Sequence, residues 1–194
     1  MTLVLRELRG AEIAPHLDAL AALRMAVFRD WPYLYEGDAA YERDYLSAYQ
    51  EAGALVVGAF DGARMVGAAT AAPMERHDDA FAAAFAGTGR DLSDIYYLAE
   101  SVLLPEWRGR GLGHAFFDAR EAEGRRQARR FAAFCSVIRP EDHPDRPEGA
   151  HSHDTFWRGR GYAPLPGVVA QLDWRDVGSE AETRKSLQFW GKDL

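Results

Sequence analysis

The sequence of 194 residues contains little cysteine, no long apolar run and no excess of positive charge. Its one cysteine, Cys135, excludes an internal disulfide, and its place in the apolar run FAAFCSVI favours a buried thiol over a nucleophile. No apolar run approaches the roughly 18 residues that cross a bilayer. The first residues, MTLVLRELRG, lack the layout of a signal peptide. These absences predict a soluble, cytoplasmic protein without a membrane partner.

The charge balance bears on the kind of partner. Lys and Arg number 23 against 30 Asp and Glu, so the net charge is −7 with histidine neutral. An acidic surface repels phosphate backbones, and we therefore expect no nucleic acid partner. With 47% apolar and 27% charged residues, the composition is that of a globular protein. The sequence contains no repeat, low-complexity tract or long linker, which predicts one domain over residues 1–194.

The apolar pattern predicts a mixed α/β chain. Asp61-Gly62 between two apolar runs is a strong hairpin signal, and apolar residues three and four apart indicate an amphipathic helix over 11–30. We expect further helices at 38–52, 78–86, 111–127 and 154–160. Strands are expected at 3–8, 54–60, 64–72, 95–104, 131–138, 167–175 and 186–191.

A glycine-rich segment carries the clearest chemical signal. Pro105 stops the buried run 95–104, and an amphipathic helix soon follows three glycines at alternate positions, Gly109, Gly111 and Gly113. Glycine lets a ligand approach main-chain N–H groups closely, and the first turn of a helix has unpaired N–H donors. Arg108 and Arg110 add positive charge. The segment therefore predicts a site for a phosphate or pyrophosphate group.

Two common phosphate-binding patterns do not fit this segment. The dinucleotide pattern G-x-G-x-x-G fails because His114 occupies the place of the third glycine, and no Gly-Lys-Ser/Thr follows for a nucleoside-triphosphate loop. What remains is Arg-x-x-Gly-x-Gly, formed by Arg108, Gly111 and Gly113. A glycine-rich turn without a ligand is the alternative. The order of strand, proline, arginine, glycines and helix favours the binding site.

The segment ESVLLPEWRGRGLGHAFFDA, residues 100–119, resembles the acetyl-CoA motif of the GNAT superfamily of N-acetyltransferases. A second segment, FWRGRGY at 156–162, is similar to that family's aromatic helix ending in Gly-Phe or Gly-Tyr. The order of the expected elements agrees with the family over nearly the whole chain. The resemblance implies one α/β (α+β) domain with a mixed, mostly antiparallel sheet of about seven strands, flanked by helices. Its central strands, 95–104 and 131–138, are expected to splay apart.

The same resemblance implies where acetyl-CoA, the expected co-substrate, would bind. The pantetheine arm would lie between the splayed strands, bonded by main-chain groups near Val102, Leu103 and Leu104. The pyrophosphate would be held by the loop and helix start, at Arg108, Gly109, Arg110, Gly111, Leu112, Gly113 and His114. No metal is expected.

The implied reaction is direct transfer of the acetyl group to an amine in a ternary complex, which would make Cys135 dispensable. Glu100 is the candidate base, because a carboxylate in an apolar run is costly unless paired or solvated. An ion pair with an arginine from a neighbouring element is the alternative. Trp157 occupies the place of the family's frequent tyrosine acid, and an indole is no useful proton donor. The candidates to replace it are His151, Ser152, His153 and Tyr162.

The acceptor is expected to bind near the connection of the first two helices, at Trp31, Tyr33, Tyr35 and Glu36. Strand alternation places Tyr96 on the face of Glu100. Tyr41, Tyr45 and Tyr49 repeat every four residues, a spacing more typical of core packing than of a ligand cage. Glu36 and Asp38 beside these aromatic residues suit a cationic amine.

A primary amine of a small molecule or of a peptide N-terminus is therefore the expected acceptor. Transfer of a longer acyl group, acetylation of protein lysines and a non-catalytic acyl-CoA sensor are the alternatives. Trp190 could pack against a dimer partner or the acceptor pocket, so the sequence leaves a homodimer as one of two alternatives.

Overall fold

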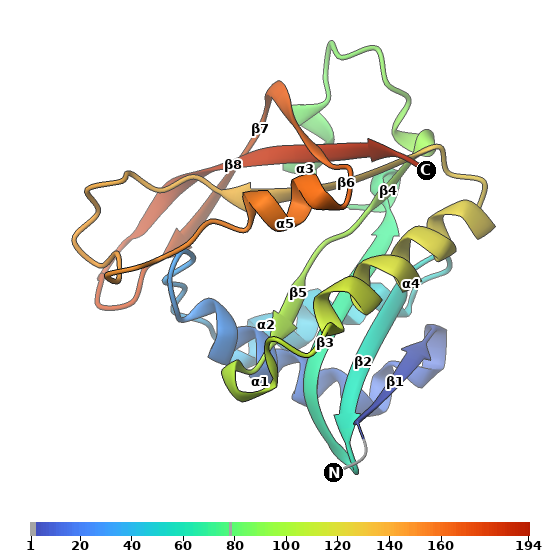
Figure 1. Cartoon of the computed structure of the whole chain (residues 1–194), viewed down its shortest axis with the longest axis horizontal. Helices are drawn as coiled ribbons and strands as arrows, with labels where there is room; N and C mark the ends of the chain where they lie inside the picture. Colours follow the sequence, from blue (N-terminus) through green and yellow to red (C-terminus); the bar gives the residue numbers. More distant parts are fainter. Residues whose placement is uncertain (1–2, 78) are drawn as a thin grey trace.

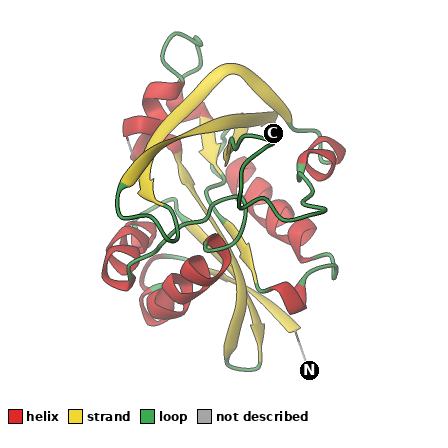
Figure 2. Ribbon diagram, turned by 90° about the vertical axis from the view of Figure 1, so that its left-hand side faces the viewer, coloured by secondary structure: helices red, strands yellow, loops and turns green. Residues whose placement is uncertain are grey.

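The computed structural model describes residues 3–77 and 79–194, and its helices lie on both sides of a twisted sheet (Figure 1, Figure 2). The strands are β1 (Leu3–Leu8), β2 (Leu55–Asp61), β3 (Arg64–Pro73), β4 (Ile95–Tyr97), β5 (Ser101–Leu103), β6 (Phe131–Val137), β7 (Ala163–Arg175) and β8 (Glu182–Asp193). The helices are α1 (Leu17–Phe28), α2 (Ala39–Ser47), α3 (Asp79–Ala84), α4 (Leu112–Arg126) and α5 (Asp154–Gly159). None of the helices in the described residues is long and apolar enough to cross a membrane.

Within the described residues the strands form an eight-stranded sheet in the order β1-β2-β3-β4-β6-β8-β7, with β5 paired to β3 alone. All pairs are antiparallel except β4 with β6. The expected mixed, mostly antiparallel sheet is confirmed. It has one strand more than expected because the run 95–104 is divided into β4 and β5.

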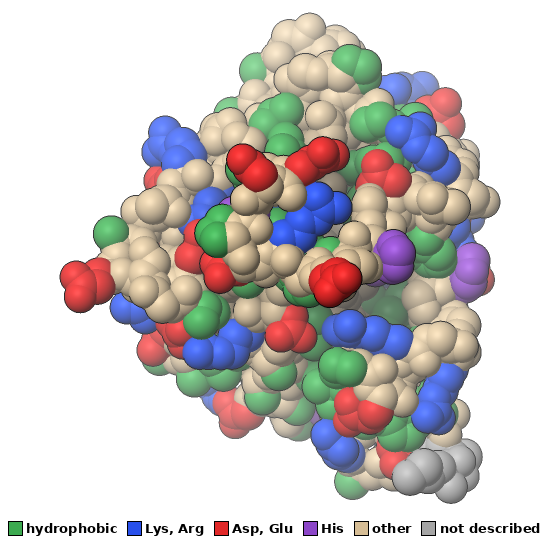
Figure 3. Space-filling model, turned by 60° about the vertical axis from the view of Figure 1, so that its left-hand side comes forward, with side chains coloured by type: hydrophobic (Ala, Val, Ile, Leu, Met, Phe, Trp, Pro, Cys, Tyr) green, Lys and Arg blue, Asp and Glu red, His purple; other side chains and the backbone are tan. Residues whose placement is uncertain are grey.

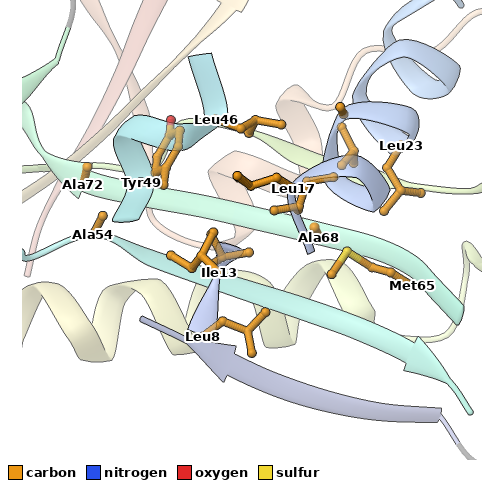
Figure 4. Packing of buried hydrophobic residues seen from close by; sticks show 14 of the residues in the cluster. Leu8, Ile13, Leu17, Leu23, Leu46, Tyr49, Ala54, Met65, Ala68 and Ala72 are labelled. Carbon is orange, nitrogen blue, oxygen red and sulfur yellow. The ribbon is translucent and has the colours of Figure 1, made fainter. Parts of the chain in front are cut away.

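The hairpin of β2 and β3 forms the centre of the N-terminal half, as the Asp61-Gly62 turn predicted. Alternate side chains point to opposite faces of a strand, and here both faces are covered. Val56 and Ala68 face α1 and α2 with the core residues of Figure 4, whereas Val57 and Val66 pack under α4 with Phe116. Burial on both faces explains why these strands consist almost entirely of apolar residues.

The C-terminal half consists of β6, β8 and β7. One face packs against α3, and the other packs Phe134, Tyr162 and Trp190 against α4 and α5. Trp190 is 3% exposed, which places it in the core of this half. The two halves meet at β4 and diverge from there (Figure 1).

Most predicted elements are confirmed, and their differences from prediction occur mainly at their ends. The first helix begins at Leu17, because residues 10–16 form two 3-10 turns, the second with Pro15 in its first turn. Asp38 caps α2 as predicted, accepting from the Tyr41 N–H at 2.9 Å. The predicted start of the third helix at residue 78 lies outside the described residues. Both closing strands are longer than expected.

Candidate active site

The central strand is interrupted where the two halves of the sheet separate. β4 pairs with β6 up to Tyr97 and Ala133, and the Leu98 N–H donates to the Ala133 carbonyl at 2.8 Å. From Ser101 to Leu103 the chain pairs with β3 only, while β6 continues along β8. The two strands thus part at Leu98, and the predicted splay is confirmed.

The pairing with β3 determines which main-chain groups face the gap. The Glu100 carbonyl accepts from the Thr70 N–H at 3.0 Å, and the Leu104 N–H donates to the Val66 carbonyl at 3.1 Å. Alternation along an antiparallel ladder therefore turns the main-chain groups of Val102 toward β3 and those of Ser101 and Leu103 toward the gap. Of the three residues expected near pantetheine, Leu103 faces the gap most directly.

A cavity of about 1110 Å³ lies between the two halves. Leu98 to Ser101, Leu103 and the start of α4 line one side, and Phe134 to Val137 line the other. The cavity continues to the loop between α1 and α2 and to the hairpin of β7 and β8. Figure 3 views the molecule from the side on which the halves diverge, and side chains of both charges surround the hollow on this face. Of the predicted site residues, the lining includes Trp31, Tyr33, Tyr35, Glu36, Glu100, Leu103, Arg108 and Gly113. Those outside it are Tyr96, Val102, Leu104, Gly109, Arg110, Gly111, Leu112 and His114.

The loop before α4 lies next to one end of this cavity, where Arg108 and Gly113 belong to the lining. Gly109 and Gly111 have φ values of +74° and +79°, and a Cβ at either residue would meet no atom within 4 Å. Gly111 is the N-cap, without a side-chain capping bond, and the Ala115 N–H is bonded to the Gly111 carbonyl. The preceding N–H groups of Leu112, Gly113 and His114 therefore have no partner within the helix. Such groups form an anion site.

The charged residues of this loop are placed differently. Arg108 lines the cavity and donates to the Leu103 carbonyl at 3.2 Å. Arg110 turns back, donating to the Glu106 carbonyl at 3.1 Å while its guanidinium lies 4.7 Å from the centre of the Trp107 ring. The His114 ring contacts Arg160 of the α5 turn at 3.2 Å. Arg108 is thus the loop cation nearest to the cavity interior.

Glu100 lies at the break in the strand and is 9% exposed. Its carboxylate pairs with Arg24 of α1 and accepts hydrogen bonds from Thr70, Tyr45 and Tyr49, the last two at 2.7 and 3.3 Å. Burial alone would raise the pKa of Glu100, but the Arg24 charge and these hydrogen bonds hold it below its usual value. The ion pair that the sequence left as the alternative is therefore present.

Arg24 also pairs with Glu42 of α2, whose side chain is fully buried. Two carboxylates share one guanidinium, which leaves this cluster one formal negative charge. Glu100 and Arg24 line the cavity, whereas Glu42 lies behind them. A net negative charge next to a cavity favours a cationic ligand.

The loop 31–38 closes the far end of the cavity. Its backbone pairs with the end of β7: the Val177 N–H donates to the Leu34 carbonyl at 2.7 Å and the Glu36 N–H to the Arg175 carbonyl at 2.9 Å. Arg139 donates to the Tyr33 carbonyl at 2.6 Å. The loop therefore joins the two diverging halves, and Trp31, Tyr33, Tyr35 and Glu36 all line the cavity as expected.

Tyr96 and Tyr97 exchange the places that simple alternation predicts. The Tyr96 hydroxyl donates to the Gly53 carbonyl at 3.0 Å, and its ring packs toward α4, outside the cavity lining. Tyr97 lines the cavity, with its hydroxyl 3.2 Å from the Cys135 sulfur. The irregular segment between β4 and β5 shifts the alternation by one residue before Glu100, so the expectation for Tyr96 was wrong.

The candidate proton donors are scattered. The Tyr162 hydroxyl is buried and donates to Glu121 at 3.1 Å, which directs it away from the cavity. His153 lines the cavity together with Trp157, and burial, aided by Arg108, lowers its pKa. His151 and Ser152 lie outside the lining. Burial raises the pKa of the Cys135 thiol to about 12, so it is protonated at neutral pH.

The fold is that of the GNAT acetyltransferases. No family model and no curated protein matches the sequence, but solved structures do. A ribosomal-protein-alanine N-acetyltransferase from Brucella melitensis shares 15% identity and a TM-score of 0.65, covering 98% of this chain and 99% of that one. YncA from Salmonella typhimurium, solved with its cofactor acetyl-CoA, shares 13% and 0.63, covering 100% and 95%. A protein assigned to the GNAT family from Desulfovibrio desulfuricans shares 15% and 0.59, covering 99% of each chain.

The sequence reading overlooked Arg24, Ser101 and Arg139. Ser101 stands beside the candidate base, so its place in the strand was the available signal. Arg24 lies on an amphipathic helix, and Arg139 in a loop rich in proline and acidic residues, where neither has a partner nearby in sequence. Their roles arise from contacts between distant segments.

Proposed function

We propose that the protein transfers the acetyl group of acetyl-CoA to a primary amine by direct attack in a ternary complex. The observation that carries this proposal is the junction of two binding elements in one cavity. At one end Arg108 and Gly113 line the cavity, next to the other unpaired N–H groups at the start of α4, and β5 continues from there into the gap. The solved structure of YncA, which has the same fold and contains acetyl-CoA, supports this choice of ligand.

In this proposal the pyrophosphate binds to the main chain from Gly109 to His114, with Arg108 and Arg110 supplying positive charge. The pantetheine arm follows β5, where β3 leaves the main-chain groups of Ser101 and the Leu103 N–H free, whereas the Leu103 carbonyl accepts from Arg108. Val102 and Leu104 lie outside the cavity lining, and their main-chain groups pair within the protein, so they are no longer proposed to bind the arm. Unpaired main-chain groups require partners, and amides of the arm can supply them.

The acceptor is proposed to be a cationic amine bound beneath the loop 31–38. Aromatic rings of Trp31, Tyr33 and Tyr35 and the carboxylate of Glu36 line this end, and rings beside carboxylates favour cations. Glu100 contributes its negative charge beside the attacking nitrogen. The lowered pKa of Glu100 makes its carboxylate a weak base. The proton that leaves the amine is therefore transferred to water, either directly or by way of Glu100.

A glycine substitution with a matched control tests the cofactor site. Gly111→Ala adds a methyl group where the pyrophosphate would approach, whereas Gly87→Ala adds one at a remote loop position. Both residues have φ of +79° and open space around the added atom, so the backbone strain is the same. We expect at least about tenfold weaker coenzyme A binding, or 1.4 kcal/mol, for Gly111→Ala alone, measured by titration calorimetry. Equal affinities of the two variants for coenzyme A would contradict the proposed pyrophosphate-binding site.

A non-catalytic acyl-CoA sensor is the second candidate, favoured by Trp157 at the place of an acid. A thiol-release assay across amines, amino acids, antibiotics and peptides separates the two functions. The enzyme releases coenzyme A with at least one class of amine. A sensor binds acetyl-CoA tightly and releases no thiol with any of them.

A further inference from the structure

Arg120 of α4 is a buried cation at the break between β4 and β5. It is 1% exposed, and no carboxylate of the described residues lies within 4.0 Å of its guanidinium. Its Nε donates to the Phe116 carbonyl at 3.1 Å, and its Nη1 donates to the carbonyls of Thr70 and Glu100 at 3.2 and 3.1 Å. The charge is therefore held by neutral dipoles and is not cancelled by an anion.

The remaining contact of this arginine is to a hydroxyl. Arg120 Nη2 donates to Ser101 Oγ at 2.8 Å. A serine hydroxyl has one hydrogen, and because Oγ accepts from a cation, this hydrogen must point away from Arg120. Ser101 is exposed and lines the cavity, and no protein acceptor for its hydrogen occurs among the described residues. The serine thus presents a polarised O–H donor to the cavity.

The position of Ser101 along β5 indicates which atom it would meet. The proposed pyrophosphate seat lies at the start of α4, and Leu103 is the first residue of β5 met from there. Ser101 is two residues deeper, about 7 Å along a strand. An arm that enters from α4 would have its amides near Leu103 and its sulfur near Ser101.

We propose that the Ser101 hydroxyl, polarised by Arg120, donates a hydrogen bond to the coenzyme A sulfur as the thioester bond breaks. This inference rests on the proposed function. It assigns to Ser101 the role of donor to the leaving sulfur, for which Trp157 and Tyr162 are unsuited. In the step, the amine nitrogen has bonded to the acetyl carbon, the carbon–sulfur bond breaks, and its electron pair passes to sulfur. The serine keeps its proton, and the thiolate later takes one from water.

The charge of Arg120 strengthens this donor. Burial lowers the pKa of Arg120 to about 10, which still leaves the guanidinium protonated at neutral pH. A positive charge in a site shielded from water stabilises developing negative charge more than it would in solution. Arg120 does not reach the sulfur itself in this arrangement. It acts as a positioning residue that directs the hydroxyl and supplies the field.

The bound thiol provides a test that does not depend on turnover. The pKa of coenzyme A bound to the protein is measured from the ultraviolet absorbance of its thiolate, in the unmodified protein and in Ser101→Ala and Ser101→Thr. We expect the bound pKa to lie below that of free coenzyme A, measured in the same buffer, in the unmodified protein and in Ser101→Thr. In Ser101→Ala it returns to that value or rises above it. Arg120→Lys is expected to lie between these limits.

Steady-state kinetics supply the second measurement. Loss of a hydrogen-bond donor to developing charge lowers kcat by about 100–1000-fold, so kcat of Ser101→Ala is expected to fall by this factor, with little change in its KM for acetyl-CoA. Ser101→Thr restores most of kcat. Equal thiol pKa values in all variants that bind coenzyme A overturn the role of Ser101 and leave the proposed function intact. Absence of coenzyme A binding in the unmodified protein overturns the proposed function itself.

Discussion

Arg139 offers a quantitative test of how the loop 31–38 is held over the cavity. Its guanidinium binds the two carboxylate oxygens of Asp176 at 2.7 and 3.0 Å and donates to the carbonyls of Pro32 and Tyr33. The side chains of Arg139 and Asp176 are 7% and 22% exposed, so the pair is largely removed from water. Arg139→Met keeps most of the apolar stem and removes every one of these contacts.

The expected loss of stability follows from the partners that remain. Removing one member of a buried ion pair costs about 3–5 kcal/mol. Lys185 Nζ stays 3.3 Å from Asp176, and Trp174 Nε1 still donates to the Tyr33 carbonyl at 3.2 Å. These contacts reduce the expected loss to about 2–3 kcal/mol. The loop 31–38 also loses its attachment to β6, so the KM for the acceptor is expected to rise.

Urea unfolding near pH 7 measures this loss against a matched control. Arg184→Met breaks a similar two-point pair with Asp173, but those side chains are 69% and 45% exposed, so water screens the pair and a much smaller loss is expected. Equal losses in the two variants would refute the reasoning from burial. An unchanged KM for an acceptor that the enzyme acetylates would refute the role of Arg139 in holding the loop 31–38.

The dependence on pH checks the electrostatic part. Burial would raise the pKa of Asp176, but hydrogen bonds from Arg139 and its charge hold it below the usual value. A carboxyl group whose pKa is lowered by folding stabilises the protein above its unfolded pKa, about 3.9 for Asp. This contribution is lost as the pH falls through the folded pKa. The difference between Arg139→Met and the unmodified protein should therefore shrink below about pH 4.

Two further outcomes follow from buried groups in the cavity. Glu100→Gln removes the charge that Arg24 and the neighbouring hydroxyls stabilise, so we expect about 2–4 kcal/mol lower stability near pH 7. The difference from the unmodified protein should be smaller in acid, where Glu100 itself becomes protonated. A difference in stability that is independent of pH would contradict the lowered pKa of Glu100. The Cys135 thiol, with its pKa raised to about 12, should react with iodoacetamide far more slowly than the unfolded chain near pH 7.5, as followed by mass spectrometry. Rapid labelling of the folded protein would show that the thiol is not buried as described.

The parts of the fold that depend on local sequence were predictable. The hairpin of β2 and β3 follows from Asp61-Gly62 between apolar runs, and α4 follows from its glycine-rich start and apolar spacing. The same local pattern identified the main-chain N–H groups that form the proposed pyrophosphate seat. Such features need only neighbouring residues, and so one sequence contains enough information to place them.

The break in the central strand could not be predicted in this way. The run IYYLAESVLL is continuous in apolar character, and nothing in it marks Leu98 as the point of divergence. The carbonyls around the break are held by Arg120, which lies 20 residues beyond Glu100 in the chain. The alternation of the strand shifts at this break, and Tyr97, not Tyr96, lines the cavity.

The interruption explains how one short segment can serve both substrates of the proposed reaction. Glu100 points toward α1 and α2, where Arg24 and Tyr45 receive it, and Ser101 points toward α4, where Arg120 receives it. In an unbroken sheet, the neighbouring strand would use the outward main-chain groups at this place. Here β6 has already diverged, so the outward groups of Ser101 and the Leu103 N–H stay open to a ligand. A negative cluster lies on the proposed acceptor side, and an unneutralised cation lies on the side of the proposed cofactor. A charged amine and a departing thiolate require opposite fields, and adjacent residues on opposite faces of an interrupted strand provide both within one cavity.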